Sequence, residues 1–541
     1  MRGMGSGSPS AIAWHEGIRA RLDSAVSPAS LRDMIGRRDF LHASGGLLAA
    51  GALSRHALGR LLGDACPPST LTDGALANFR SAIHGQVILP TDADYASARL
   101  LFHRRFDQFP LMVVRVADES DVSRTIDFAR TNGIRLAVRS GGHSYIGASG
   151  GSGIVLDLSL MSLIQDLGGG HFRIGSGTQL QRVYGHLRCN GDWTLPAGSC
   201  PTVCFGGLAL GGGFGYRQRS LGLTCDRIRA VRIARADGTF VTAAPDGDGD
   251  LFWALRGGGG NSFGVATTID VEAAPYRTLR VHLWRWPLSA MGDALAHLIQ
   301  VQQADLLPRS VTGALLCNSY TVASNPPTCL FLAWGNGPES ELDLARQILT
   351  GPGGVPMSPG SFTASDDVVP PCSPNEMPAR AWYRAKSAMV YGPVPGDTGA
   401  LIQEWMQRRI SALAPITVDD YAAINLFTVR GAVGDVAPDA TAYAHRQALL
   451  EVQFLGYVNS PNPTANAIND AWIRGFYADV YPRLSSAGSG AYVNYPDDDL
   501  TDAQWPFQYW GANYARLQAT KRRVDPQDFF RGRQTVRLAS R

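Results

Sequence analysis

The residues best suited to covalent chemistry stand in two glycine-rich loops. The first loop, RSGGHSY at residues 139–145, carries the imidazole of His143, and the second, GSCPTV at residues 198–203, carries the thiol of Cys200. Both groups are nucleophiles that can bond to a bound molecule, and paired glycines at the end of a strand let backbone N–H groups approach an anion. Each pattern alone is more typical of a turn or a buried thiol, so neither loop assigns a function by itself.

The first loop is expected to leave a strand, because the apolar run Ile134–Val138 follows a helical stretch at Glu119–Thr131. Similar alternation up to about Ala274 predicts strands at Leu111–Val116, Ile154–Leu158, Phe172–Ser176 and Ile228–Ala236. Beyond Pro275 it predicts strands at Ala314–Tyr320 and Cys329–Trp334, and amphipathic helices at Ser340–Leu349 and Thr398–Ala412. Since 541 residues are too many for one typical core, the sequence predicts an α+β protein of two domains.

Composition excludes several classes of function. A net charge of +3 without a basic stripe argues against nucleic-acid binding. The sequence contains no HExxH pair, which would indicate a metal centre, and no Gly-x-Ser-x-Gly elbow that is followed by a plausible triad.

Cys317 and Cys329 flank a turn-rich link and are a candidate disulfide. The cysteines without a readable partner are expected to be buried thiols, namely Cys66, Cys189, Cys204, Cys225 and Cys372.

The first 65 residues are predicted to be a targeting region. Gly36–Leu41, GRRDFL, is a twin-arginine pattern, and the apolar stretch Leu47–Leu53 behind it is too short to span a bilayer. An amphipathic helix that happens to contain Arg-Arg is the alternative interpretation. The expected location is therefore periplasmic or secreted, with the true start at Met34 and cleavage near Ala65.

Five segments in order resemble the berberine bridge enzyme-like family of FAD-linked oxidases, within the vanillyl-alcohol oxidase/p-cresol methylhydroxylase superfamily. They are RSGGHSY, CPTVCFGGLALGGGFG, DLFWALRGGGGNSFGVAT, YVNYPDDDL and DPQDFF. The resemblance runs from Phe106 to Phe530 and suits a bacterial exported member. It implies an FAD-binding domain at residues 66–275, a substrate domain with an antiparallel sheet backed by helices at residues 276–489, and a segment at residues 490–541 that returns to the FAD domain.

The resemblance also implies which residues hold the cofactor. His143 is expected to bond the flavin 8α-methyl and Cys200 the flavin C6, so that FAD is attached at two points; Cys204 is a rival for the second bond. Gly257–Gly260 is expected beside the adenosine half, although a bare glycine run is more often a flexible loop. The other expected cofactor contacts are Arg139, Ser140, Gly141, Gly142, Ser144, Val203, Gly206, Gly207, Gly264, Val265 and Asn494.

For catalysis, the resemblance points to Tyr495 as the base that takes a substrate proton. The alternative is that Ala491–Tyr495 is a half-buried strand with packed tyrosines. Gln453 matches a position on a substrate-lining strand where the alkaloid-cyclising branch has a glutamate; glutamine cannot act as a base, so ring-forming chemistry is disfavoured. Glu451 shares a face with Gln453 by the period of two in a strand and is a less favoured base.

Two positions depart from the family pattern. Leu208 stands where the family has a histidine near the flavin, and it cannot hydrogen-bond to the ring or help to neutralise its reduced anionic form. Arg430 lies in TVRGA, where Tyr-Gly-Gly-Ala is usual, and is expected to face an acidic or polyoxygenated substrate. The predicted activity is oxidation of a sugar, alcohol or secondary metabolite, with molecular oxygen as acceptor. A flavin dehydrogenase with another acceptor and a flavin-binding protein without turnover are the alternatives.

Overall fold

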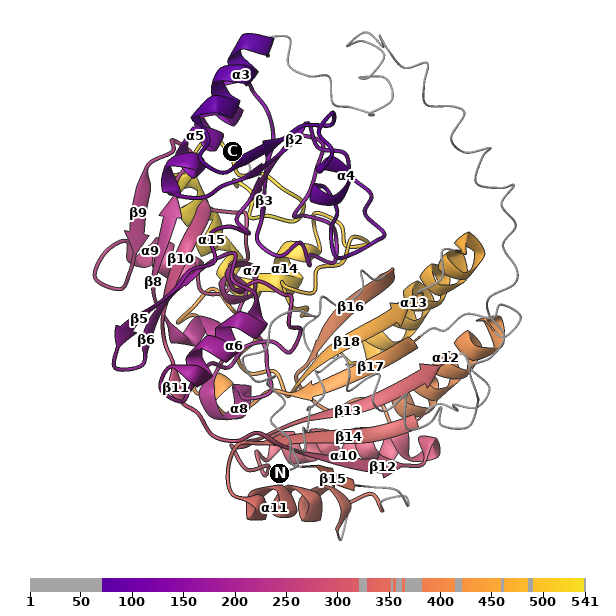
Figure 1. Ribbon diagram of the computed structural model, residues 1–541. Helices are drawn as coiled ribbons and strands as arrows, with labels where there is room; N and C mark the ends of the chain where they lie inside the picture. The colour runs from indigo at the N-terminus through magenta and orange to yellow at the C-terminus, as the bar shows by residue number, and fades with distance from the viewer. Residues whose placement is uncertain are drawn as a thin grey trace, which may run out of the picture.

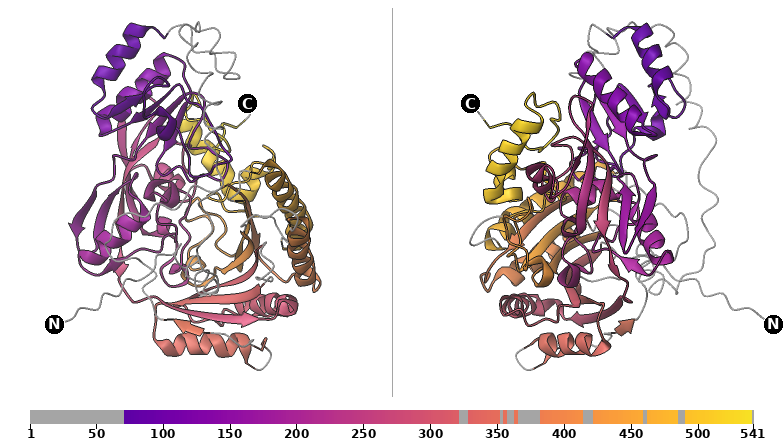
Figure 2. Two further views of the ribbon diagram at one scale, coloured as in Figure 1. Left: turned by 45° about the vertical axis from the view of Figure 1, so that its right-hand side comes forward. Right: turned by 90° about the vertical axis from the view of Figure 1, so that its left-hand side faces the viewer.

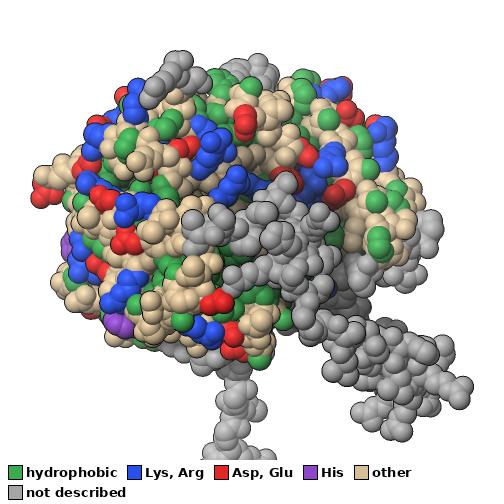
Figure 3. Space-filling view, turned by 90° about the horizontal axis from the view of Figure 1, so that it is seen from above, with side chains coloured by type: hydrophobic (Ala, Val, Ile, Leu, Met, Phe, Trp, Pro, Cys, Tyr) green, Lys and Arg blue, Asp and Glu red, His purple; other side chains and the backbone are tan. Residues whose placement is uncertain are grey.

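The computed structural model describes residues 71–320, 328–351, 354–356, 362–364, 382–413, 421–458, 462–484 and 490–539. The twin-arginine segment, Met34, Ala65, Cys66 and Cys372 lie outside these residues. Within them, no helix is both long and apolar enough to cross a bilayer. On the face shown in Figure 3, basic and acidic side chains are interspersed over the described surface.

A small, mainly parallel sheet leads into the first loop. Its strand order is β1-β2-β4-β3, and β4 runs parallel to both β2 and β3. The bounds are β1 Gln86–Ile88, β2 Met112–Arg115, β3 Leu136–Arg139 and β4 Ile154–Asp157, with the short helix α4 at Tyr95–Ala98. Helices α3 (Asp73–Ala82) and α5 (Glu119–Thr131) place apolar side chains in the same core. The Asp118 carboxylate caps α5 by accepting a hydrogen bond from the Asp121 N–H.

A five-stranded antiparallel sheet completes this half of the molecule, in the order β5-β6-β10-β8-β9. The strands are β5 Ile164–Gly168, β6 His171–Gly175, β8 Ile228–Ala234, β9 Phe240–Ala243 and β10 Val265–Glu272. The elements between and beside them are α6 Leu180–Cys189, β7 Trp193–Thr194, α7 Phe205–Leu210, α8 Gln218–Leu221, α9 Gly249–Ala254 and β11 Ala274–Pro275. The second loop lies directly before α7, so the apolar core around α6, α7 and this sheet fixes its position.

The second half is built on a seven-stranded antiparallel sheet, ordered β15-β12-β14-β13-β17-β18-β16. The strands are β12 Arg280–Trp286, β13 Val311–Tyr320, β14 Thr328–Gly335, β15 Phe362–Ala364, β16 Tyr383–Val390, β17 Tyr421–Thr428 and β18 Leu450–Tyr457. One face packs against the helices α10 Met291–Gln303, α11 Glu339–Thr350, α12 Thr398–Leu413 and α13 Pro463–Leu484. The other face turns toward the first half (Figure 1), where Tyr383 and Leu455 of the sheet meet Phe102 and Tyr145.

The C-terminal segment crosses back to the first half, as the resemblance implies. Helices α14 (Trp505–Trp510) and α15 (Tyr514–Val524) lie beside the first half in both views of Figure 2. The buried Lys521 ammonium anchors α15 by donating to the Ser262 carbonyl at 2.7 Å and by pairing with Asp525 at 2.7 Å. The two-domain α+β fold with a returning tail is therefore confirmed.

Most predicted elements are present, with a few differences. The structure begins β3 at Leu136 rather than Ile134, and residues 491–495 form a turn rather than a strand, with the Tyr495 N–H donating to the Tyr492 carbonyl at 2.8 Å. Gly257–Gly260 is not a free loop, because the N–H groups of Gly257 and Gly259 both donate to the Leu210 carbonyl.

The cysteine predictions need two corrections. Cys317 and Cys329 are direct partners in the β13–β14 register, but both are free, buried thiols, and the Cys329 sulfur lies 3.6 Å from the Met291 sulfur instead. Cys189 was expected to be a free thiol and is disulfide-bonded. Cys204 and Cys225 are buried and free as expected.

Candidate active site

The two loops meet in the structure. A Cβ atom added at Gly141 would lie 2.8 Å from the Cys204 backbone nitrogen, and one added at Gly206 would lie 2.7 Å from the Ser176 Cβ. Gly142 has a φ of +70°, a left-handed conformation that favours glycine. These glycines allow the chain after β3 to touch the chain before α7, which holds both loops at one place.

His143 lies at the contact between the loops. Its Nε2 is 3.0 Å from the Thr202 hydroxyl, and its ring stacks on Phe102 with the ring centroids 4.1 Å apart. Burial lowers the pKa of His143 to about 4, and the hydrogen bond with Thr202 only partly opposes this effect. The imidazole is therefore neutral at neutral pH and keeps a nitrogen lone pair, which a nucleophile requires.

Cys200 differs from the neighbouring thiol, Cys204, in its accessibility. Its side chain is accessible to solvent, yet burial among surrounding atoms raises the pKa of its thiol, while a hydrogen bond with Ser199 acts in the opposite direction. Cys204 is only 5% exposed, and its sulfur donates to the Gly177 carbonyl at 3.3 Å. Burial raises the pKa of Cys204 to about 12. Cys200 is thus the more accessible of the two thiols.

Unpartnered polar atoms surround the point where the loops meet. Arg139 uses one guanidinium nitrogen, Nη2, to pair with Asp157 and to donate to the Ala98 carbonyl, both at 2.7 Å. Among the described residues, its buried Nη1 has no hydrogen-bond partner, and neither do the buried hydroxyls of Ser176 and Thr178, which lie next to the second loop. Buried polar groups are normally satisfied. These atoms, together with the glycines at 141 and 206, fit an elongated polar cofactor such as FAD.

Three further residues predicted at the cofactor lie in or beside the loops. The Ser140 hydroxyl is 3.1 Å from the position of a Cβ at Gly206, so it lies between the loops. The Ser144 hydroxyl accepts a hydrogen bond from the Ala148 N–H at 3.2 Å and supports the turn after His143. The Val203 N–H donates to the Cys200 carbonyl at 3.3 Å, which places Val203 in the turn that presents the thiol.

Three others have a less direct relation to the loops. Gly207 has open space at its Cβ position, so no close approach requires glycine there. Gly264 has a φ of +154°, and a Cβ there would lie 2.3 Å from the Ala234 carbonyl oxygen, so it is needed for close packing on β8. Val265 begins β10 and is buried in the core of the parallel sheet. The structure thus joins Gly264 and Val265 to β8 rather than to His143 or Cys200.

The tail packs against α7 and the glycine-rich segment after it through residues 492–495. The Tyr492 hydroxyl accepts hydrogen bonds from the N–H groups of Gly213, at 2.8 Å, and Phe214, at 3.3 Å. The Asn494 amide donates to the Leu208 carbonyl and to the Tyr492 hydroxyl, each at 3.0 Å. These bonds fix Tyr495 beside the loops. The Leu208 side chain lies against Gly198 and Gly213, so this position supplies packing and a backbone acceptor.

Tyr495 and Gln453 are brought together through a residue of the first loop, Tyr145. The rings of Tyr495 and Tyr145 stack with centroids 5.1 Å apart and planes inclined by 5°. The Gln453 amide donates to the Tyr145 hydroxyl at 2.7 Å, and its carbonyl accepts from the Asn425 amide at 3.3 Å. A line of polar groups therefore runs from β17 across β18 to the tyrosine pair.

The electrostatics of Tyr495 differ from what a simple base requires. Burial and then the charge of Glu451 raise the pKa of Tyr495 well above its ordinary value. Burial likewise raises the pKa of Tyr145, with Tyr495 adding to the effect. Both hydroxyls are thus protonated at neutral pH, and a tyrosinate is not available before substrate binds.

Several residues near Cys200 are not singled out by the sequence. Electrostatic interaction with Cys200 is shared by six tyrosines, namely Tyr145, Tyr184, Tyr216, Tyr383, Tyr457 and Tyr495. Tyr216 also stacks on Trp334, with centroids 4.3 Å apart. Tyr145 could have been found in the RSGGHSY motif itself. Tyr383 could have been found only from the period of two along β16 together with knowledge of which strand lies beside β18.

Among the described residues, no contact is found between Arg430 and the site residues named above. It has a φ of +28° and lies beside the buried Arg219, whose pKa its charge helps to lower, although burial is the main cause. Its expected contact with the substrate therefore finds no support in the structure.

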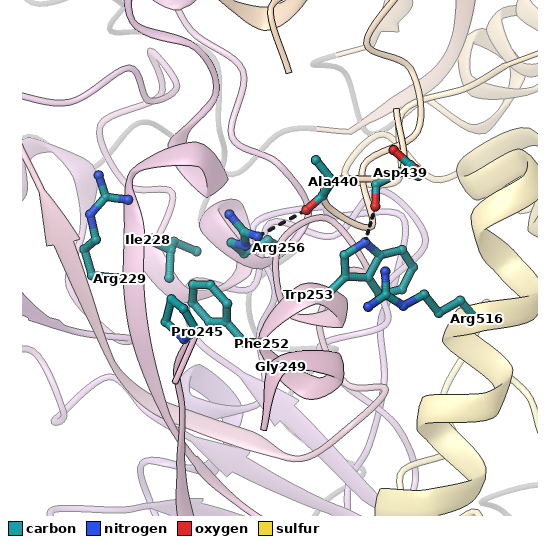
Figure 4. A pocket seen from close by; sticks show the side chains of 10 residues that line it. All are labelled: Ile228, Arg229, Pro245, Gly249, Phe252, Trp253, Arg256, Asp439, Ala440 and Arg516. Atoms are coloured by element: carbon teal, nitrogen blue, oxygen red, sulfur yellow. Dashed lines mark hydrogen bonds between the residues drawn. The ribbon is translucent and has the colours of Figure 1, made fainter. Parts of the chain in front are cut away.

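A separate cavity of about 390 Å³ opens between β8, α9 and α15 (Figure 4). Trp253 and Arg256 close one wall by donating to backbone carbonyls at 2.7 and 3.2 Å. Arg229 and Arg516 each pair with a carboxylate. No predicted site residue lines this cavity, so it is not part of the candidate site.

Comparison with known families supports the flavin interpretation. The model of the FAD binding domain matches residues 110–244, which contain both loops. The model described as "Berberine and berberine like" matches residues 491–537, which contain Tyr495 and the returning tail.

Known proteins resemble the chain along most of its length. It is 29% identical to aclacinomycin-N/aclacinomycin-A oxidase of Streptomyces galilaeus, over 81% of this chain and 86% of that protein. It is 26% identical to chitooligosaccharide oxidase of Gibberella zeae, over 86% and 96%. The structure of berberine bridge enzyme-like protein 28 from Arabidopsis thaliana superposes with a TM-score of 0.75 at 26% identity, over 86% of this chain and 100% of that one. The chain therefore carries an FAD binding domain and a berberine-like C-terminal domain, and along most of its length it is similar to berberine bridge enzyme-like FAD-linked oxidoreductases.

Proposed function

We propose that this enzyme oxidises the CH–OH group of a sugar, alcohol or secondary metabolite to a carbonyl or lactone and passes the electrons to oxygen, giving hydrogen peroxide. The observation that carries the proposal is the stacked pair Tyr145–Tyr495, in which the Tyr145 hydroxyl accepts a hydrogen bond from the Gln453 amide of β18. Two relatives named above are oxidases, and one is named for a chitooligosaccharide.

We further propose that FAD is bonded at two points, to His143 and Cys200. The neutral imidazole of His143 and the accessible thiol of Cys200 support this, since both nucleophiles lie at the contact between the loops. The turn at Thr202–Val203 joins them, because the buried Thr202 hydroxyl contacts His143 and the Val203 N–H donates to the Cys200 carbonyl. Two bonds hold a flat ring without covering its faces, which leaves space for a bulky substrate.

The bound flavin supplies the acceptor for a hydride from the substrate carbon. The protein must then orient the substrate hydroxyl and remove its proton. Aromatic rings near Cys200, including Tyr216 and Tyr383, are proposed to offer faces for stacking on a sugar or polycyclic substrate. The amides of Gln453 and Asn425 offer donors and acceptors for its hydroxyl groups. Tyr495 is the proposed group that receives the hydroxyl proton.

The test is anaerobic reduction of the flavin by a panel of sugars and alcohols, followed by admission of air and measurement of peroxide. One mole of peroxide per mole of substrate is expected. Val203→Leu should slow reoxidation by oxygen and leave anaerobic reduction nearly intact, because a bulkier side chain three residues after Cys200 would cover the flavin edge. If the reduced wild-type flavin is stable in air, the enzyme is a dehydrogenase.

Export by the twin-arginine route is also proposed, on the sequence pattern alone. Replacement of Arg37 and Arg38 by lysine should leave the precursor inside the cell, measured by fractionation of a bacterial host. Unchanged export of that variant would remove this proposal.

A further inference from the structure

A carboxyl group that the proposed reaction does not use lies on the same strand face as Gln453. Glu451 stands two residues earlier in β18, and the residues opposite it in the β16 and β17 register are Met389 and Phe427. Its exposed fraction is 0%, and neither carboxyl oxygen has a hydrogen-bond partner among the described residues. An isolated buried carboxylate costs several kcal/mol, so retaining this side chain in an apolar setting calls for an explanation.

Glu451 is oriented toward the tyrosines of the site rather than toward the helices. Its neighbours Leu450 and Val452 belong to the core under α10–α13, so the side chain of Glu451 points to the opposite face of the sheet. Among the charged groups that act on Tyr495, Glu451 has the largest effect, and it also acts on Tyr443. No ion pair to Glu451 is found in the described part of the chain. The other groups that act on Tyr495 are Tyr492, Cys200 and Tyr216, none of them a cation.

We propose that Glu451 is the final acceptor of the substrate's hydroxyl proton, which reaches it through the hydroxyl of Tyr495. This inference rests on the proposed function. As the hydride leaves the substrate carbon for the flavin, the substrate O–H proton passes to the Tyr495 oxygen while the proton of Tyr495 passes to the Glu451 carboxylate. The products are a carbonyl, a neutral tyrosine and a protonated Glu451. The transferred hydride, the proton held by Glu451 and oxygen together make up hydrogen peroxide.

The relay removes the difficulty that Tyr495 presents as a base. A tyrosine protonated at neutral pH can accept a proton only if it gives one away in the same step. Proton transfer requires heavy atoms within about 3.2 Å or one bridging water, and such contacts often form only when substrate is bound. Both carboxyl oxygens of Glu451 are free to make that contact. Because burial also raises the pKa of Glu451 well above its ordinary value, the active carboxylate form should become more abundant as pH rises.

The first test compares wild type with Glu451→Gln, which keeps the shape and removes the acceptor. Anaerobic flavin reduction should rise with pH through one ionisation in wild type, and in the variant it should be slowed about 10²-fold and lose that ionisation. Glu404→Gln, at an exposed ion pair on α12, is the matched control and should behave as wild type. Glu451→Asp should keep the ionisation at a lower rate. If Glu451→Gln leaves the rate of flavin reduction and its pH profile unchanged, Glu451 has only a packing role. If the rate increases, Glu451 acts only as a charge that opposes ionisation of Tyr495.

The second test does not use turnover. Infrared difference spectra of the substrate-free, flavin-loaded protein should show the carbonyl band of a buried, protonated carboxyl that disappears as pH rises, with the midpoint found for flavin reduction. The band should be missing from Glu451→Gln. A wild-type protein without this band, or with a different midpoint, overturns the relay. If no alcohol or sugar reduces the wild-type flavin, the proposed function fails as well; if wild type is reduced and Glu451→Gln is not impaired, the relay alone fails.

Discussion

At the scale of single residues, His143 and Cys200 are prepared differently for bond formation. His143 is neutral because burial lowers its pKa to about 4, whereas burial keeps Cys200 as a thiol. The proposed histidyl bond to flavin should therefore form more readily in the newly folded protein than the proposed thioether bond, for which a proton must first be lost.

The prediction is that wild-type protein stays yellow after acid precipitation and that peptide mapping finds flavin on both residues. His143→Ala and Cys200→Ala should each retain one bond, and the double variant should release all flavin. Cys204→Ala serves as the control, because its buried thiol is already hydrogen-bonded to Gly177, and it should keep both bonds. Loss of the second bond in Cys204→Ala would move that attachment from Cys200 to Cys204.

Tyr495 can be tested with a change that keeps its stacking. Phenylalanine preserves the ring against Tyr145 and removes the hydroxyl, so Tyr495→Phe should fold and retain flavin. Anaerobic reduction should slow by about 10²–10⁴-fold, the usual contribution of a positioned proton-transfer group. Tyr514→Phe, also in the tail, should reduce at the wild-type rate. Equal rates for Tyr495→Phe and wild type would leave Tyr495 with a packing role.

At the scale of elements, β16 holds the tail in the position that Tyr495 needs. The Lys386 ammonium pairs with Asp497 at 2.6 Å and with Asp499 at 2.7 Å, and the Ser387 hydroxyl accepts from the Tyr492 N–H at 2.9 Å. Both Lys386 and Asp497 are 3% exposed. One strand of the seven-stranded sheet thus fixes the tail on both sides of Tyr495.

Removing Lys386 from its pair with Asp497 should lower the free energy of unfolding, and removing the Asp497 charge as well should restore part of it. Lys386→Met leaves the Asp497 charge buried without its partner, which typically costs about 3–5 kcal/mol. Adding Asp497→Asn removes that charge and should restore part of the unfolding midpoint in urea. Flavin reduction should stay impaired in both variants because the tail is no longer fixed. A double variant no more stable than Lys386→Met would contradict the assignment of the cost to the buried charge.

The same elements show what the sequence could and could not predict. Helix α5 and the strands β13 and β14 were predicted closely, because their apolar periodicity is local. For residues 491–495 the sequence leaves a half-buried strand as an alternative, because tyrosines spaced along an extended run give the same pattern whether they pack in a sheet or on a loop. The contacts of Ser387 and Lys386 with the tail join residues more than 100 positions apart, so no local pattern reveals them.

At the scale of the whole molecule, the site exists only where three distant parts of the chain meet. The first loop supplies His143 and Tyr145, β18 supplies Glu451 and Gln453, and the tail supplies Tyr495. His103, near the first loop, stacks on Tyr383 of β16 with ring centroids 4.0 Å apart. This contact belongs to the interface between the two halves, so the protonation of His103 should affect how firmly they hold together.

Acid should weaken the folded protein through His103. Burial, with the charge of Arg105 as a second cause, lowers the pKa of His103 to about 3, whereas an unfolded histidine titrates near 6.5. Between these two pKa values the unfolded chain binds more protons than the folded protein. The contribution of His103 to the free energy of unfolding is therefore complete above about pH 6.5 and decreases as the pH falls toward 3. The loss is on the order of several kcal/mol for a fully buried group.

His103→Phe keeps the stacking on Tyr383 and cannot titrate. The variant should melt below wild type at pH 8, because a hydrogen bond from the Arg105 N–H is lost, and the difference should narrow or reverse at pH 5. His171→Gln, at an exposed histidine of β6, should follow the wild-type curve. Melting temperatures of His103→Phe and wild type that fall in parallel with pH would show that other groups govern acid stability.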